Sequence, residues 1–238
     1  MITLRPYQRA LARQAEAILQ QRGLCYLAME MRVGKTLIAM RVAEIMRARR
    51  VLFVTKKMAI GSIQKDYDGL MPSFAIQITN YERLHRHVGE QYDLVIADEA
   101  HSLGAFPRPT KRARDLRAIM THYSVKPKYL LLSGTPSPES YSQLYHQLWP
   151  CDASPFRQWK NFYEWARSGH VFPRVVMIGS RTITDYRHAN KPLIDQECQG
   201  LFLTFTQREA EFKVTELEDE IITVPTDERV MRLMKILV

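Results

Sequence analysis

The chain has 238 residues, 46% of them hydrophobic and 25% charged, which is enough to bury one large core and a small appendage. No apolar run approaches the roughly eighteen residues that a membrane span needs, and the N-terminus lacks the apolar centre of a secretory signal. We therefore expect a cytoplasmic protein that makes no membrane contact. The three cysteines, Cys25, Cys151 and Cys198, are far apart and include no CxxC pair, which favours buried free thiols over disulfides or a zinc site.

The formal net charge is +9, and the excess lies in one part of the chain. Residues 1–60 hold twelve Lys/Arg against three Asp/Glu, whereas the remainder holds twenty-two of each. A basic face suits a polyphosphate nucleotide or a nucleic-acid backbone, but basic helices are also common as solvated surface. Charge alone leaves both interpretations open.

Apolar runs typical of strands alternate with helically spaced stretches through about residue 150. Near-continuous apolar strands separated by helices predict an α/β fold, with a parallel sheet covered on both faces and ligands outside the carboxyl ends of the strands. We expect helices over 7–22 and 36–49, and strands at 24–28, 51–55, 74–79, 93–97 and 129–132.

After Pro150 the pattern changes, and we interpret residues 151–238 as a small, mostly helical appendage to a lobe formed by residues 1–150. The periodicity indicates helices over 156–168 and 192–212, with short β-like runs and basic residues between them. Further along, the sequence predicts an acidic solvated segment at 215–220, a strand at 221–226, and a helix from 228 that stops abruptly.

The strand at 24–28 runs into MEMRVGKT and then a helix, the context in which Gly-Lys-Thr is meaningful. Backbone N–H groups at the helix start would point at phosphates, and Lys35 can reach the β and γ oxygens. Thr36 would place its hydroxyl on Mg²⁺. We expect the nucleotide to be bound by Met31, Arg32, Val33, Gly34, Lys35 and Thr36.

Two positions depart from the strict phosphate-binding pattern. Met29 stands where that pattern has glycine, and Arg32 stands where glycine is also frequent. The Arg32 side chain either reaches a phosphate oxygen or folds outward, since arginine is both a good phosphate ligand and a good surface residue.

The apolar strand DLVIA ends in Asp98-Glu99-Ala100-His101, an acidic pair at a strand tip. In this context Asp98 is expected to hold Mg²⁺, and Glu99 to orient and deprotonate the attacking water. The alternative is that the two acids merely cap the next helix.

These motifs, in this order, resemble those of superfamily two helicases and translocases, whose motif II is DEAH or a close variant. The resemblance covers the first 150 residues and implies a RecA-like ATP-binding lobe that uses Mg·ATP and contacts nucleic acid. LRPYQ resembles the adenine-recognition element of that superfamily, in which Gln8 would hydrogen-bond the adenine edge. The alternative interpretation is that Gln8 is an exposed residue at a helix start.

Two further elements resemble the parts of that family that act on nucleic acid. Ser133-Gly134-Thr135-Pro136 is similar to motif III. This resemblance implies that His101, Ser133 and Thr135 couple the nucleotide to the nucleic-acid site. The alternative is that Gly-Thr-Pro after a strand simply forms a tight turn. Lys56 and Lys57, and Asn80 and Tyr81 in ITNYERL, fall where the family contacts the phosphate backbone. A solvated lysine pair and a core tyrosine are the alternatives.

Within the superfamily, LLLSGTP, ESYSQLYHQLWP and the basic stretch after DEAH most resemble the Swi/Snf-like group, in forms carried by bacteria and phages. That group commonly has Lys-Asn shortly after DEAH, where this chain has Leu103-Gly104-Ala105. The resemblance implies location in a bacterial or phage-infected host cytoplasm. Motifs IV to VI have no counterpart, so a second RecA-like lobe would come from the same protein or from a partner.

The leading hypothesis is the first motor lobe of an ATP-dependent DNA helicase or translocase, acting on double-stranded or branched DNA rather than RNA. The second is a nucleotide-binding switch, or a motor subunit of a restriction or repair complex that needs a partner for hydrolysis. A small-molecule P-loop kinase is a third possibility, against which the DEAH and SGTP motifs count.

Overall fold

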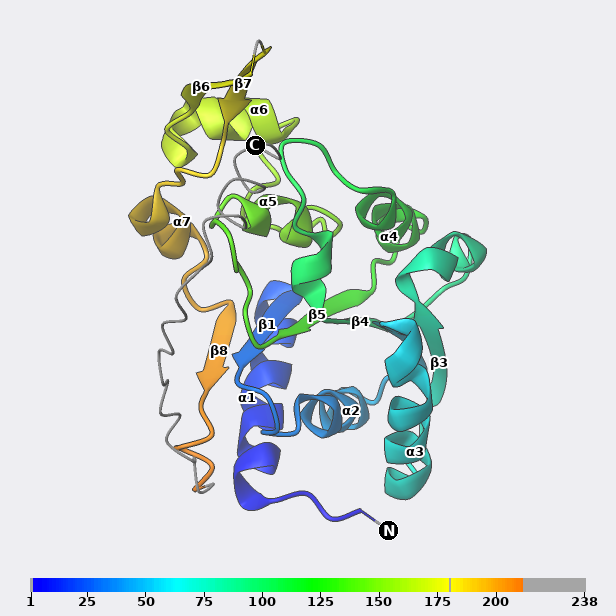
Figure 1. Ribbon diagram of the computed structural model, residues 1–238. Helices are drawn as coiled ribbons and strands as arrows, with labels where there is room; N and C mark the ends of the chain where they lie inside the picture. Colours follow the sequence, from blue (N-terminus) through cyan, green and yellow to red (C-terminus); the bar gives the residue numbers. More distant parts are fainter. Residues whose placement is uncertain (1, 180, 212–238) are drawn as a thin grey trace, which may run out of the picture.

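The computed structural model describes residues 2–179 and 181–211, which contain a six-stranded parallel sheet (Figure 1). The strand order is β3-β2-β4-β5-β1-β8, and every neighbouring pair is parallel. The strands are β1 (Leu24–Met29), β2 (Arg50–Thr55), β3 (Ala75–Asn80), β4 (Leu94–Asp98), β5 (Lys128–Ser133) and β8 (Phe202–Phe205). The first five confirm the predicted strands to within one residue or two.

Helices cover both faces of this sheet, because alternate residues of each apolar strand point to opposite sides. Leu24 and Tyr26 of β1 enter one core, whereas Cys25 and Leu27 enter the other. Figure 1 shows α1 (Pro6–Arg22), α2 (Lys35–Ile45) and α3 (Ile60–Leu70) below the sheet. On the other side, α4 (Lys111–Thr121) and α5 (Gln143–Leu148) lie above it.

Three short 3-10 helices follow directly on the carboxyl ends of strands and so carry the motif residues. They are η1 (Lys57–Ala59) after β2, η2 (Tyr81–His87) after β3, and η3 (Ala100–Leu103) after β4. Because the strands are parallel, these ends meet at one edge of the sheet, as the sequence predicts.

The region after residue 150 contains short helices and a two-stranded hairpin. Its elements are α6 (Phe162–Trp165), the π-helical turn η4 (Ala166–His170), strands β6 (Arg174–Ile178) and β7 (Arg181–Asp185), which form an antiparallel pair, and α7 (Lys191–Glu197). The helix predicted over 156–168 therefore begins later, at Phe162.

The helix predicted over 192–212 is wrong beyond Glu197. Residues Phe202–Phe205 instead form β8, which pairs with β1 at the edge of the main sheet. Phe202 stacks on the ring of Tyr26, with centroids 4.8 Å apart, and this packing overrides the helical spacing. The segments predicted at 215–220, 221–226 and 228–238 lie outside the described residues. Within the described part, no helix is long and apolar enough to cross a membrane.

Candidate nucleotide and nucleic-acid sites

The loop between β1 and α2 has the backbone of a phosphate-binding loop. Gly34 has φ 82° and ψ 39°, a left-handed conformation that suits glycine, and a Cβ there would lie 2.2 Å from Gln8 Nε2. No side chain caps the first turn of α2, so the helix start is open to an anion. The loop therefore fits a phosphate group.

Lys35 begins α2, and its side chain turns back into the loop. Its Nζ donates to the carbonyl oxygens of Met29 and Glu30, each at 2.9 Å. Burial lowers the pKa of Lys35, while the nearby carboxylates of Glu99 and Asp98 act in the opposite direction. The loop thus keeps a cation close to the acidic pair at the end of β4.

The other predicted loop residues take different positions. Met31 is 73% exposed, whereas Val33 is fully buried. Arg32 is exposed and has φ 66°, so its backbone is in the left-handed region and its side chain turns towards solvent. Thr36 lies partly buried in the first turn of α2.

Gln8 is part of the loop's scaffold. Its side chain is only 5% exposed, which excludes the alternative of an exposed residue at a helix start. Its Oε1 accepts from Arg5 N at 2.9 Å, and its Nε2 donates to Val33 O at 3.3 Å. Tyr7 Oη donates to the same carbonyl at 3.1 Å. The start of α1 is therefore fixed against the phosphate-binding loop.

Asp98 lies at the carboxyl end of β4 and is oriented from the neighbouring strand. Its Oδ2 accepts from Thr55 Oγ1 at 2.8 Å, and its carbonyl accepts from Tyr81 Oη at 2.5 Å. Burial raises the pKa of Asp98, and the Thr55 hydrogen bond and Lys35 oppose that rise. Thr55 is fully buried, and sequence reasoning did not identify it.

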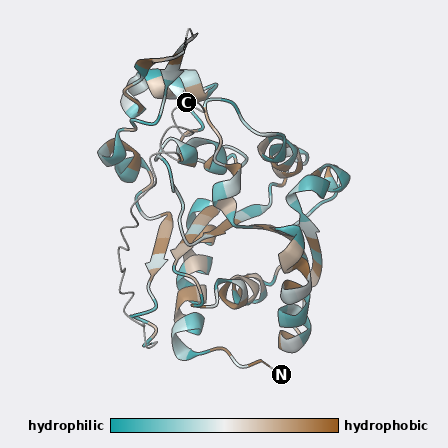
Figure 2. Cartoon of the chain, viewed as in Figure 1, coloured by the Kyte–Doolittle hydropathy of each residue, from teal (hydrophilic) through white to brown (hydrophobic). Residues whose placement is uncertain are grey.

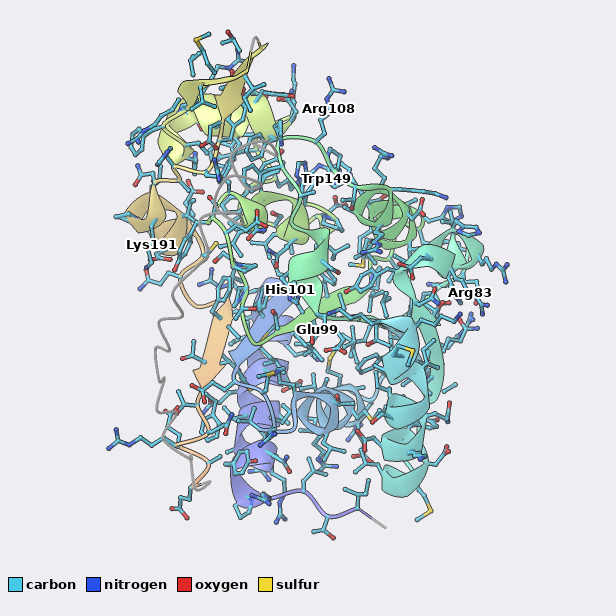
Figure 3. The ribbon with its side chains drawn as sticks, viewed as in Figure 1. Arg83, Glu99, His101, Arg108, Trp149 and Lys191 are labelled. Carbon is cyan, nitrogen blue, oxygen red and sulfur yellow. The ribbon has the colours of Figure 1, made fainter. Side chains whose placement is uncertain are left out.

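Glu99 and His101 lie just after the end of β4 (Figure 3), and Ser133 at the end of β5 contacts His101. His101 Nδ1 lies 3.3 Å from Glu99 Oε2 and 3.0 Å from Ser133 Oγ. Ser133 Oγ also accepts from Thr135 N at 3.1 Å. The SGTP segment therefore forms a turn and also links His101 to the residues that follow β5. Glu99 has φ 51°, a left-handed conformation that is uncommon for a non-glycine residue.

Gln147 of α5 is a buried member of this network that the sequence did not reveal. It is fully buried, its Oε1 accepts from Tyr26 Oη at 2.7 Å, and its Nε2 donates to Pro136 O at 2.7 Å. A Cβ on Gly104 would lie 2.9 Å from Gln147 Nε2. The same Cβ would lie 2.8 Å from Gln143 Cβ and 3.0 Å from the Gln143 carbonyl oxygen, so position 104 has no room for a side chain.

A groove of about 560 Å³ lies at the carboxyl ends of β2 and β3, and we call it the basic groove. Its lining includes the exposed Lys56 and Lys57, together with Asn80, Glu82, Arg83, Ser102 and Arg112. Figure 3 shows Arg83 at its outer side. The structure thus brings three of the four predicted nucleic-acid residues to one groove, and it adds Arg83 and Arg112.

Tyr81 and Asn80 hold this region together. Tyr81 is 2% exposed, and the guanidinium of Arg112 lies over its ring at 5.9 Å, so the ring is a core aromatic with no free face for a base. Asn80 Oδ1 accepts from Arg83 N at 3.1 Å and caps η2. Arg112 also pairs with Glu82 at 2.6 Å.

Among solved structures, the chain is similar to the Sulfolobus solfataricus SWI2/SNF2 ATPase core domain, with a TM-score of 0.62 and 17% identity over 87% of this chain and 44% of that one. It also matches the Pyrococcus furiosus Hef helicase domain, with a TM-score of 0.49 and 16% identity over 60% and 36% of the two chains. A DNA-bound Type ISP restriction-modification enzyme, LlaBIII, matches with a TM-score of 0.44 and 16% identity, over 57% of this chain and 13% of that one.

No protein-family model matches the chain, and no curated protein matches it. The chain spans less than half the length of each of the three structures above. The six-stranded parallel sheet with helices on both faces is a RecA-like α/β fold. In particular, it is the fold found in the SWI2/SNF2 ATPase core, and this confirms the predicted fold class.

Proposed function

We propose that this chain is the first motor lobe of an ATP-dependent DNA helicase or translocase of the Swi/Snf-like kind, carried by a bacterium or phage. The observation that carries the proposal is the convergence of Lys35, Asp98 and Glu99 at the end of the sheet where RecA-like folds bind ligands. The basic groove opens beside that site and suits a polyanionic backbone.

Each site residue then has a role in binding Mg·ATP. Lys35 and the start of α2 bind phosphate oxygens, with Met31, Arg32, Val33 and Gly34 shaping the loop. Thr36 and Asp98 would hold Mg²⁺, which would offset the charge on the phosphates. Gln8 recognises adenine by exchanging its present backbone partners for the base edge.

Glu99 acts as the general base, and the neighbouring residues transmit the nucleotide state. With His101 on one side, Glu99 can orient a water and accept its proton. His101, Ser133 and Thr135 link this carboxylate to the SGTP segment, and Gln147 extends the link to α5. Residues 151–238 would lead toward a second RecA-like lobe, in this protein or in a partner, that completes hydrolysis.

The proposal is tested by measuring how the nucleotide changes DNA affinity, since this needs no turnover. Anisotropy of labelled duplex DNA is recorded with and without a non-hydrolysable Mg·ATP analogue. A motor lobe should show coupling of about five- to 150-fold, equal in both directions. His101→Ala should reduce the coupling while leaving nucleotide affinity within about twofold of wild type.

Lys35→Ala is the companion variant, and it should abolish nucleotide binding but leave nucleotide-free DNA binding intact. If the analogue binds tightly and DNA affinity does not change, the chain is not a motor lobe. If DNA does not bind at all, the nucleic-acid part of the proposal fails.

A further inference from the structure

A small pocket of about 140 Å³ lies between α4 and the segment 149–160, which joins α5 to α6, and we call it the cationic pocket. Its position is set by contact of that segment with the start of β1, since a Cβ on Gly23 would lie 3.2 Å from Ala153 Cβ. Gly23 precedes β1, so the pocket lies toward the amino ends of the strands. The nucleotide site lies at their carboxyl ends, and the two sites are therefore separate.

The lining of the cationic pocket carries an excess of positive charge. It contains the cations Arg117, Arg157 and Lys160 and one carboxylate, Asp152. In the described part of the chain, none of these three cations forms an ion pair. Glu164 accepts from the backbone N of Lys160 at 2.9 Å, but it does not line the pocket. The pocket thus suits an anion.

Arg117 is the cation whose position is fixed. It belongs to α4, which is largely hydrophilic (Figure 2) and holds four Lys/Arg against one Asp. Its Nη1 donates to Trp149 O at 2.5 Å, and its guanidinium lies 4.6 Å from the centre of the Trp149 ring. Figure 3 shows Trp149 on the side of the sheet that α4 and α5 cover. Because a guanidinium has five N–H donors, the fixed fork keeps donors for a ligand.

Uncharged donors are also left over at the pocket. Ser154 lines it and is 6% exposed. Its Oγ accepts from Phe156 N at 3.2 Å, whereas its own hydrogen has no acceptor among the described residues. Tyr145 stacks on Phe156, and its buried Oη has no partner in the described part of the chain. Burial raises the pKa of Tyr145 to about 12, and the charge of Arg117 opposes that rise, so this hydroxyl lies near the guanidinium.

We propose that the cationic pocket binds a phosphate group, as free phosphate or as a phosphate monoester. Its volume is well below the roughly 300 Å³ at which pockets for drug-sized molecules begin, so only a small group fits. A tetrahedral dianion offers paired oxygens to the Arg117 fork, an acceptor to the Ser154 hydroxyl, and the charge that the three cations lack. A carboxylate would supply only one negative charge.

Two sources carry this chemistry, a small phosphorylated molecule and the 5′-phosphate at a DNA end. Because the cationic pocket is separate from the phosphate-binding loop, the inference does not rest on the function proposed above.

The test uses the full chain with Lys35→Ala, which weakens phosphate binding at the nucleotide site. Inorganic phosphate is titrated at constant ionic strength, and binding is followed by calorimetry. The pocket variant adds Arg157→Gln and Lys160→Gln, both at exposed side chains. The matched control adds Arg114→Gln and Lys126→Gln, which are also exposed but lie outside the lining. Thermal melting without phosphate checks that both variants fold.

We expect saturable binding of phosphate to the Lys35→Ala chain and to the control. The pocket variant should bind it about tenfold more weakly, because two of the three cations are lost. Phosphate should also raise the melting temperature of the control more than that of the pocket variant. Arg117→Lys in the Lys35→Ala background should weaken binding as well, since lysine keeps the charge but lacks the planar fork.

Oligonucleotides that carry a 5′-phosphate or a 5′-hydroxyl identify the source. A DNA end is the source if the phosphorylated form binds more tightly and the pocket variant abolishes the difference. A small phosphorylated molecule is the source if both forms bind equally while free phosphate binds in the pocket. The inference is overturned if the Lys35→Ala chain binds neither form of phosphate, or if the pocket variant and the control bind phosphate equally.

Discussion

Replacing Thr55 with valine removes one hydroxyl from the buried end of β2 and tests whether Asp98 is the metal-binding carboxylate. Thr55 Oγ1 donates to Asp98 Oδ2 at 2.8 Å, and Thr55 is fully buried. The bond opposes the effect of burial, which raises the pKa of Asp98. Without it, the carboxylate is less well oriented and its charged form is less favoured.

The magnitude follows from the strength of hydrogen bonds to charged groups, about 1.5–3 kcal/mol. At about 1.4 kcal/mol for each factor of ten, Thr55→Val should raise the Mg²⁺ concentration needed for half-maximal nucleotide binding by about 10- to 100-fold. The assay is a titration of a fluorescent ATP analogue at several Mg²⁺ concentrations. Thr55→Ser keeps the hydroxyl and should behave as wild type.

Two controls separate a metal effect from general damage. With the metal chelated, Thr55→Val and wild type should bind the analogue equally, because only the metal-dependent part is lost. An equal Mg²⁺ requirement in the valine and serine variants would refute the assignment of Asp98 to the metal.

The remaining predictions concern stability. Gly34→Ala should abolish analogue binding and lower the melting temperature, because the new Cβ would lie 2.2 Å from Gln8 Nε2 and because φ is positive at this residue. An unchanged melting temperature would contradict this prediction. Burial raises the pKa of Asp98, so the protonated carboxyl favours folding at low pH, and this stability is lost as pH rises through the raised pKa. Asp98→Asn should therefore have a higher melting temperature than wild type at pH 8, measured by calorimetry. Burial lowers the pKa of His146 from 6.5 to about 4. The neutral histidine therefore contributes fully to the free energy of unfolding above pH 6.5. This contribution is lost as pH falls toward 4, by up to about 3 kcal/mol. Denaturant unfolding at pH 7 and 4.5 should show a smaller loss for His146→Gln than for wild type.

The central part of the fold was predictable because its strands are short, nearly continuous apolar runs. Such runs suit strands buried on both faces, and the residues at their carboxyl ends carried the recognisable motifs. Lys35, Asp98 and Glu99 could be placed in one site on this basis, since parallel strands end at a common edge.

The connections made by long-range packing were not predictable. Thr55 meets Asp98 across 43 positions of sequence, and Tyr26 meets Gln147 across 121; neither pair has a local pattern. Phe202–Phe205 reads equally well as helix or strand, because a short apolar run is ambiguous until its partner is known. Here the partner is β1.

The exposed apolar face of the β6–β7 hairpin was also not evident from the sequence. A sequence with valines and a methionine in a β-like run suggests burial, yet Val175 and Met177 are mostly exposed. Conversely, Tyr81 lies within a motif that resembles a nucleic-acid-contacting element, but its ring is buried. Which side of an element faces solvent depends on its packing partners.

The most direct test of the motor account is ATP hydrolysis with and without duplex DNA, measured on this chain and on the longest natural form of the protein, with Glu99→Gln as the control. We predict that the longer form hydrolyses ATP, that DNA stimulates it, and that Glu99→Gln silences it, with little or no hydrolysis by the lobe alone. If the longer form binds ATP but DNA changes nothing, the motor account is contradicted and a nucleotide-binding switch takes its place.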